Sequence, residues 1–186
     1  MVHLEKFGSE DFEQLIQWIN DPVTMKKWSG SLFKFPLTHD TLQWYIQDSN
    51  DSINSSSFNY KIIETATGTS VGHISIGGIS RKNRSARITR VFLAPETRGK
   101  GFCVPALQQA MAIAFDELKM HRLELGVYTG NPSAEKCYTR AGFRSEGIHR
   151  DNFYYRGEFW SIHEMSILED EWVEIKATAA AANPKP

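Results

Sequence analysis

Residues 91–104 read VFLAPETRGKGFCV and contain the strand-to-helix loop on which the fold prediction rests. The apolar run that ends at Leu93 is typical of a strand, and apolar residues recur at helical spacing from Phe102 onward. The segment 98–101, which holds two glycines and two cations, lies between them. Because a helix N-terminus presents unpaired N–H groups, this loop is a candidate binding site for an anion.

Two common phosphate-binding patterns do not fit this loop. A Walker loop needs Gly-Lys-Ser/Thr four residues after a glycine, and a dinucleotide fingerprint needs three glycines after the first strand of a β-α-β unit. A pyrophosphate site remains, in which Gly99 and Gly101 let the backbone approach the anion while Arg98 and Lys100 add charge. From these residues alone, a solvated turn is the alternative.

Composition favours one ordinary folded domain. The chain has 186 residues, of which 41% are hydrophobic and 23% charged, and its formal charge of -1 gives no general attraction to nucleic acid or to a membrane. Only two cysteines occur and the first residues lack the apolar core of a signal peptide, which predicts a reducing, cytoplasmic compartment. The six histidines lack metal-ligand spacing, so no metal is predicted.

Hydrophobic periodicity predicts an α+β fold with a mixed sheet flanked by helices. The predicted strands are 2–7, 58–65, 69–78, 85–95, 122–128, 143–150 and 157–168, and the predicted helices lie within 9–22, after Thr38, from Phe102 and within 131–143. The alternation falters near Arg90, which a bulge or burial of both faces would explain. We expect a single domain over 1–173 and a mobile tail over 174–186.

A second motif, NPSAEKCYTRAGF at 131–143, follows the glycine loop, and the two together resemble the Gcn5-related N-acetyltransferase (GNAT) family. The loop pattern of the family, Arg/Gln-x-x-Gly-x-Gly/Ala, is met at Arg98 and Gly101, whereas Cys103 departs from it. The second pattern of the family is met in full by Asn131, Ala134, Tyr138, Gly142 and Phe143. The resemblance implies a central mixed, mostly antiparallel sheet with a splayed strand pair.

The resemblance also implies an enzyme that transfers an acetyl group directly from acetyl-CoA to a primary amine. In the family, loop amides hold the pyrophosphate, the preceding strand pairs with the pantetheine arm, and a backbone N–H, here of Val91 or Phe92, stabilises the oxyanion. The implied cofactor-binding residues are Val91, Phe92, Leu93, Arg98, Gly99, Lys100, Gly101, Phe102, Cys103 and Asn131.

Tyr138 and Glu124 are the predicted catalytic residues. A phenol at the end of the pantetheine channel can protonate the departing thiolate, although Tyr138 could instead be a core residue. Ribosomal-protein N-terminal acetyltransferases of the family often carry a glutamate at the place of Gly126, so the usual base is missing. Glu124 is the candidate base, with an exposed or salt-bridged role as its alternative. Further candidates are His73, His149, Glu158, His163 and water.

The resemblance is closest to the branch that acetylates ribosomal-protein N-termini, aminoglycosides, polyamines and amino sugars, so we expect a small amine or a peptide N-terminus as acceptor. Its slot is expected among aromatic and acidic residues of the first helices and last hairpin, namely Trp18, Trp28, Phe33, Phe35, Trp44, Tyr45, Tyr154, Tyr155, Asp21, Asp40, Asp151 and Glu158. A basic group is expected to protect a strand edge, or to meet the 3′-phosphate of the cofactor or an acidic acceptor; it comprises Arg81, Lys82, Arg84, Arg87 and Arg90. A non-catalytic acyl-CoA-binding domain is the alternative function, and a monomer or homodimer is expected.

Overall fold

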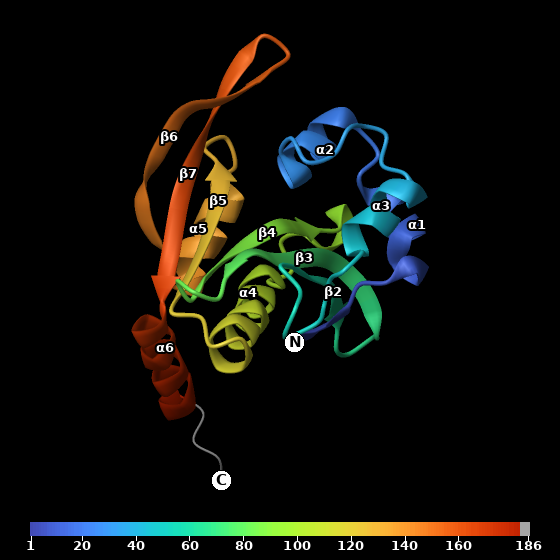
Figure 1. Ribbon diagram of the computed structural model, residues 1–186. Helices are drawn as coiled ribbons and strands as arrows, with labels where there is room; N and C mark the ends of the chain where they lie inside the picture. Colours follow the sequence, from blue (N-terminus) through green and yellow to red (C-terminus); the bar gives the residue numbers. More distant parts are fainter. Residues whose placement is uncertain (183–186) are drawn as a thin grey trace.

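The computed structural model describes residues 1–182, which form a seven-stranded sheet in the order β1-β2-β3-β4-β5-β7-β6 (Figure 1). The strands are β1 (Val2–Lys6), β2 (Phe58–Glu64), β3 (Thr69–Ser80), β4 (Ser85–Leu93), β5 (Arg122–Tyr128), β6 (Arg144–Tyr155) and β7 (Glu158–Leu168). Strands β4 and β5 are parallel, and the other neighbouring pairs are antiparallel. The predicted α+β class with a mostly antiparallel sheet is therefore confirmed.

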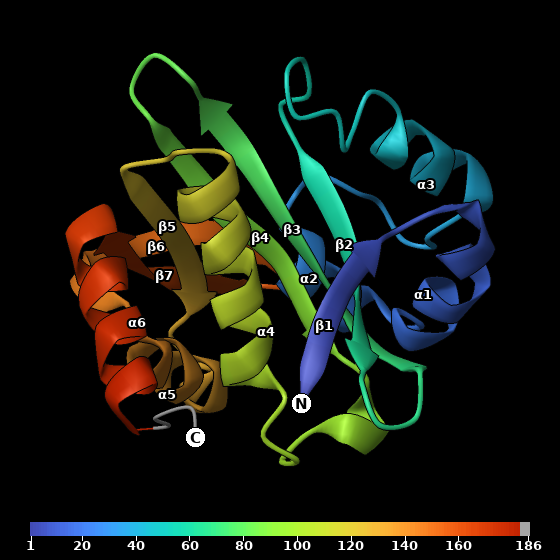
Figure 2. The same cartoon turned by 90° about the horizontal axis from the view of Figure 1, so that it is seen from below.

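Helices lie on both faces of the sheet, with α4 across one face and α2 behind the other (Figure 2). The helical elements are η1 (Ser9–Asp11), α1 (Phe12–Trp18), α2 (Pro22–Ser29), α3 (His39–Ile46), η2 (Pro95–Thr97), α4 (Cys103–Met111), η3 (Ala112–Glu117), α5 (Pro132–Ala141) and α6 (Glu169–Ala182). The larger core joins the sheet to α4, where Leu107 and Met111 are fully buried. A second core joins α1, α2 and α3 to Phe92 of β4. Strand β4 therefore contributes to both cores.

Helix α2 is a difference from the sequence prediction, in which Pro22 ends the preceding helix. Pro22 instead occupies the first turn of α2, where its missing N–H breaks no intrahelical bond. The Asp21 carboxylate caps this helix, because it accepts hydrogen bonds from the N–H groups of Val23 at 2.8 Å and Thr24 at 3.0 Å. An Asp-Pro pair can thus begin a helix as well as end one, and α2 forms a wall of the site described below.

The parallel strands β4 and β5 pair only at their beginnings. Ser85–Arg87 pairs with Arg122–Glu124, and the register ends there. In the β3–β4 pair the register shifts between His73 and Ser75, opposite Arg90, whose φ of 52° lies in the left-handed region. The bulge predicted near Arg90 is therefore present, and the implied splay of two strands is confirmed.

Helix α6 includes residues 174–182 of the tail predicted over 174–186. It runs to Ala182, and Trp172 in its first half is buried, with Nε1 donating to the Asp116 carboxylate at 3.2 Å. The alanines that follow have the highest helix propensity, so the helix continues beyond its packed part. The predicted tail residues 183–186 lie outside the described residues.

Cys103 and Cys137 form a disulfide, with their Cα atoms 6.4 Å apart. This bond was not predicted from the sequence, because the predicted reducing compartment would keep both thiols free. The bond joins the first turn of α4 to α5, two helices that pack against each other. Because the cysteines are 34 residues apart in sequence, local patterns carry no information on this contact.

Candidate active site

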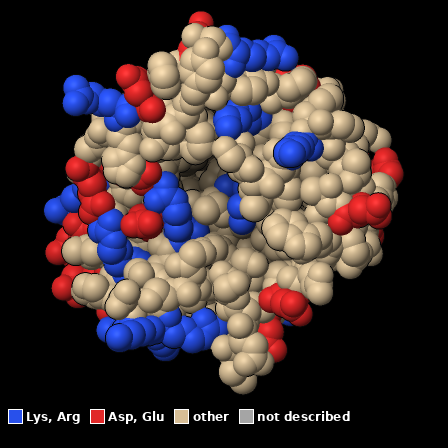
Figure 3. All heavy atoms as spheres, turned by 45° about the horizontal axis from the view of Figure 1, so that its top comes forward, with Lys and Arg blue, Asp and Glu red and all other residues tan. Residues whose placement is uncertain are grey.

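A cavity of about 560 Å³ lies where β4 and β5 diverge. Its walls come from α2, β4, the β5–α5 segment and the β6–β7 hairpin. Lysine and arginine side chains border the central hollow on this side of the molecule (Figure 3). Three of the predicted site residues, Val91, Asn131 and Tyr138, line the same cavity although they come from different elements.

The carbonyl of Arg90, at the bulge, accepts hydrogen bonds from two directions. Trp28 Nε1 donates to it at 3.0 Å, and His73 Nδ1 lies 3.1 Å from it. Burial lowers the pKa of His73 to about 3, so its imidazole is neutral and Nδ1 carries the proton that this carbonyl accepts. Because a trans peptide points its C=O and N–H in opposite directions, the Val91 N–H points away from Trp28 and His73.

Tyr138 reaches the cavity from the buried side of α5. The residue is only 6% exposed, and burial raises its pKa to about 12. Its hydroxyl is therefore protonated at neutral pH, as a proton donor must be. Asn131 caps the same helix, with Oδ1 accepting from the Ala134 N–H at 3.2 Å, so the local motif places both residues at the cavity.

The glycine loop leads directly into α4. Gly99 and Gly101 have φ values of 76° and 83°, a conformation that L side chains disfavour. In residues 1–182 no atom lies within 4 Å of a Cβ built at either position, so backbone conformation and not space requires glycine. Arg98 turns back onto β4, where Nε donates to the Leu93 carbonyl at 3.1 Å and the guanidinium lies 5.4 Å from the Phe92 ring centre.

The other predicted loop residues have different environments. Lys100 is exposed at the surface, Phe102 is buried in the larger core, and Cys103 forms the disulfide. Of the predicted loop residues, Arg98, Gly99, Lys100 and Gly101 are therefore the exposed ones.

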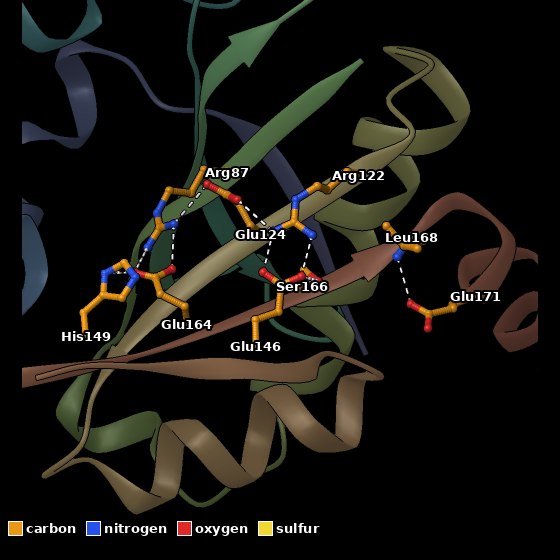
Figure 4. Close-up of polar contacts among 9 residues, drawn as sticks. All are labelled: Arg87, Arg122, Glu124, Glu146, His149, Glu164, Ser166, Leu168 and Glu171. Carbon is orange, nitrogen blue, oxygen red and sulfur yellow. Dashed lines mark hydrogen bonds and ion pairs between the residues drawn. The ribbon is translucent and has the colours of Figure 1, made fainter. Parts of the chain in front are cut away.

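Glu124 does not line the cavity. Its carboxylate pairs with Arg87 and with Arg122, each at 3.1 Å. Arg87 also pairs with Glu164 at 2.8 Å, and Arg122 with Glu146 at 2.5 Å, which makes a continuous network (Figure 4). Hydrogen bonds from Arg122 lower the pKa of Glu146 to about 2. Glu124 lies in the same network, where Arg87 and Arg122 each donate a hydrogen bond to one of its two carboxylate oxygens.

The position of the Arg87 side chain explains why residue 126 is a glycine. A Cβ built at Gly126 would lie 2.5 Å from Arg87 Nη2, 2.9 Å from Ile162 Cγ2 and 3.1 Å from Glu164 Oε1. The guanidinium therefore fills the space above the position where the resemblance implies a glutamate. The sequence predicted Arg87 only as part of a basic group, because its partner Glu164 is 77 residues away.

Replacing Gly126 with alanine is expected to destabilise the fold by about 1–3 kcal/mol, because the added methyl group overpacks against Ile162 and displaces Arg87. Urea unfolding measures the effect. The control is Gly130→Ala, four residues further on, where a Cβ has no neighbour within 4 Å. Equal stability of the two variants would contradict the packing argument.

The remaining predicted bases also lie outside this cavity. His163 bonds to Glu135 at 2.7 Å and to Ser145 at 2.6 Å, and His149 lies 3.9 Å from Glu164. Of the residues that the structure describes, no Asp, Glu or His belongs to the lining. The acidic residues expected at the acceptor slot are therefore absent from it, whereas the aromatic wall is formed by Trp28, Tyr128, Phe153, Phe159 and Trp160.

Comparison with known proteins identifies the family of this chain. Residues 2–144 match the family model of the acetyltransferase (GNAT) domain. The chain belongs to the GNAT family. This agrees with the resemblance carried by the glycine loop and by the motif at 131–143.

Relatives in the GNAT family include amine acetyltransferases. The chain is 30% identical to spermidine N(1)-acetyltransferase of Vibrio cholerae over 60% of this chain and 64% of the relative. It is 32% identical to the putative ribosomal N-acetyltransferase YdaF of Bacillus subtilis over 56% and 57% of the two chains. It thus matches less than two thirds of the length of these relatives. The fold resembles the crystal structure of the Vibrio cholerae spermidine enzyme in complex with CoA and spermine, with a TM-score of 0.80, 22% identity and coverage of 92% and 98%.

Residues 1–182 contain no group of three or more His, Cys, Asp or Glu side chains that could hold a metal ion. Over the same residues, no helix combines the length and apolar character required to cross a membrane.

Proposed function

We propose that this chain is an acetyl-CoA-dependent N-acetyltransferase that acts on the primary amine of a small molecule or of a peptide N-terminus. The observation that carries the proposal is the position of Tyr138 in the same cavity as the bulged Arg90–Val91 peptide. The first supplies a protonated phenol and the second a backbone N–H, which are the two donors that acyl transfer from a thioester requires.

Acetyl-CoA binding is proposed along β4 and the glycine loop. The backbone from Val91 to Leu93 would pair with the pantetheine arm and Asn131 would contact it. The amides of 98–103 would hold the pyrophosphate at the N-terminus of α4. Support comes from the exposed loop with two left-handed glycines and from the end of β4–β5 pairing before Val91.

In the proposed reaction the neutral amine attacks the thioester carbonyl, and the Val91 N–H donates a hydrogen bond to the oxyanion. The carbon–sulfur bond then breaks, and the Tyr138 hydroxyl gives its proton to the departing thiolate. The proton released by the acetylated nitrogen restores the phenol. Because the described cavity lining contains no carboxylate or imidazole, we propose water, and not Glu124, as the group that first deprotonates the ammonium.

Two measurements test this function together. Calorimetric titration with acetyl-CoA, with dephospho-CoA as the control, reports binding, and release of the CoA thiol in the presence of a panel of amines reports transfer. Micromolar binding with turnover is expected. Binding without turnover on any amine would support the non-catalytic acyl-CoA-binding alternative, and absence of binding would contradict both functions.

Replacing Gly101 with alanine is expected to weaken acetyl-CoA binding about tenfold. A left-handed backbone disfavours a Cβ by roughly 1–2 kcal/mol, so the loop would leave the conformation that presents its amides to the pyrophosphate. The matched control is Gly68→Ala in the β2–β3 turn, which has a φ of 69° and open space around its Cβ position. An unchanged dissociation constant for the Gly101 variant would remove the loop from the binding site.

A further inference from the structure

The candidate acceptor cavity is lined by cations. Lys27 of α2 and both Arg87 and Arg90 of β4 belong to the lining. As stated above, no Asp or Glu among the described residues joins them there. A polyamine with several ammonium groups would meet like charge in this cavity, which disfavours binding. The cavity charge is therefore opposite to what a purely cationic substrate requires.

The three cations are not equivalent. Arg87 is neutralised by Glu124 at 3.1 Å and Glu164 at 2.8 Å. Lys27 is exposed to solvent, which weakens its field. Arg90 has no ion-pair partner within residues 1–182: its Nε donates to the neutral Tyr45 hydroxyl at 2.8 Å, and its guanidinium lies 4.8 Å from the centre of that ring. Arg90 thus keeps a full positive charge with free N–H groups.

A second polar group without a partner belongs to Thr89, the residue before Arg90. The Thr89 hydroxyl oxygen is buried and has no hydrogen-bond partner among the described residues. It lies 3.8 Å from a Cβ built at Gly77, and Arg90 Nη2 lies 3.9 Å from the same point. Buried polar groups are nearly always satisfied, so the unpartnered hydroxyl marks a gap in the hydrogen bonding at the residue before Arg90, and the unpaired Arg90 guanidinium offers an anionic acceptor group a place to bind.

We propose that the acceptor is a small amine that also carries a carboxylate or phosphate group, which Arg90 binds while the amine faces the thioester. This inference rests on the proposed acetyl transfer. A guanidinium binds a carboxylate or a phosphate through paired N–H donors. The cavity therefore selects an anionic group with two neighbouring oxygen acceptors, which both have. The aromatic wall of Tyr128, Phe153 and Trp160 supplies an apolar surface for the rest of the molecule.

Matched pairs of amines test this selection on the unmodified protein. Phenylalanine is compared with phenylalaninamide, phosphoethanolamine with ethanolamine, and both pairs with spermidine, by kcat/KM for CoA thiol release. The acidic member of at least one pair is expected to react tenfold or more better than the member without the acid group, and the pair that responds identifies carboxylate or phosphate. Preference for the members without an acid group or for spermidine would overturn the inference.

Substitution of Arg90 localises the preference. Arg90→Gln is expected to reduce the ratio of kcat/KM between the amines with and without an acid group to about one, whereas Arg90→Lys keeps part of this ratio. The control is Arg84→Gln, which removes the same charge from a residue with the same left-handed backbone, φ 51°, outside the cavity lining. An unchanged ratio in Arg90→Gln would contradict the role of Arg90.

A binding measurement separates this inference from the proposed function. If no amine releases CoA thiol, the proposed acetyl transfer fails. The amines with and without an acid group are then titrated calorimetrically into the protein in the presence of CoA. Tighter binding of the acidic members would sustain the selection of an anion, and equal or absent binding of both would overturn it.

Discussion

Replacing Tyr138 with phenylalanine is expected to lower kcat about 100-fold while the dissociation constant for acetyl-CoA stays within a factor of two or three, the size of effect found when one general acid is removed. The ring remains, so the packing of α5 is kept and only the hydroxyl is lost. With its pKa raised to about 12 by burial, the phenol holds its proton at every pH at which the protein is assayed, and Tyr138 belongs to the cavity lining. Steady-state CoA thiol release measures the loss.

The chain offers a matched control for this substitution. Tyr60 of β2 is also buried, and burial raises its pKa to about 12, but it lies outside the cavity lining. Tyr60→Phe removes a hydroxyl from a comparable environment and is expected to leave kcat unchanged. If both variants kept full activity, Tyr138 would be a core residue and the thiolate would leave without its help.

Local signals were sufficient to predict the elements that form much of the candidate site. Asn131 and Gly142 mark the two ends of α5 within one short segment, because an amide cap and a left-handed stop both act on the nearest backbone groups. The faltering alternation around Arg90 predicts the bulge for the same reason. The splayed strands and the position of Tyr138 in the cavity follow from these local features together with the family resemblance.

The parts that the sequence did not predict depend on contacts between distant segments. Glu124 was a candidate base because its neighbours were unknown, and the network with Arg87 and Glu164 brings three strands together. The acceptor cavity lacks the expected carboxylates for the same reason. Helix α2 is a different case: Asp21 and Pro22 carry a local signal that also fits a helix end, and only packing decides between the two.

The second large effect concerns the disulfide between Cys103 and Cys137. Reduction is expected to lower the free energy of unfolding by about 4 kcal/mol, because the bond closes a loop between residues 34 positions apart and restricts the unfolded chain. For a protein of this size, a loss of about 4 kcal/mol corresponds to a fall in Tm of roughly 8–15 °C. Thermal unfolding with and without dithiothreitol measures the shift.

Two single variants, Cys103→Ala and Cys137→Ala, serve as controls, since neither can form the bond. Both are expected to melt close to the reduced protein and to show no further shift with dithiothreitol. Two free thiols in protein purified without reductant would contradict the bond itself. Because the bond links the first turn of α4 to the residue before Tyr138, weaker acetyl-CoA binding after reduction would show that the disulfide positions the two halves of the proposed cofactor site; unchanged binding would limit it to a role in stability.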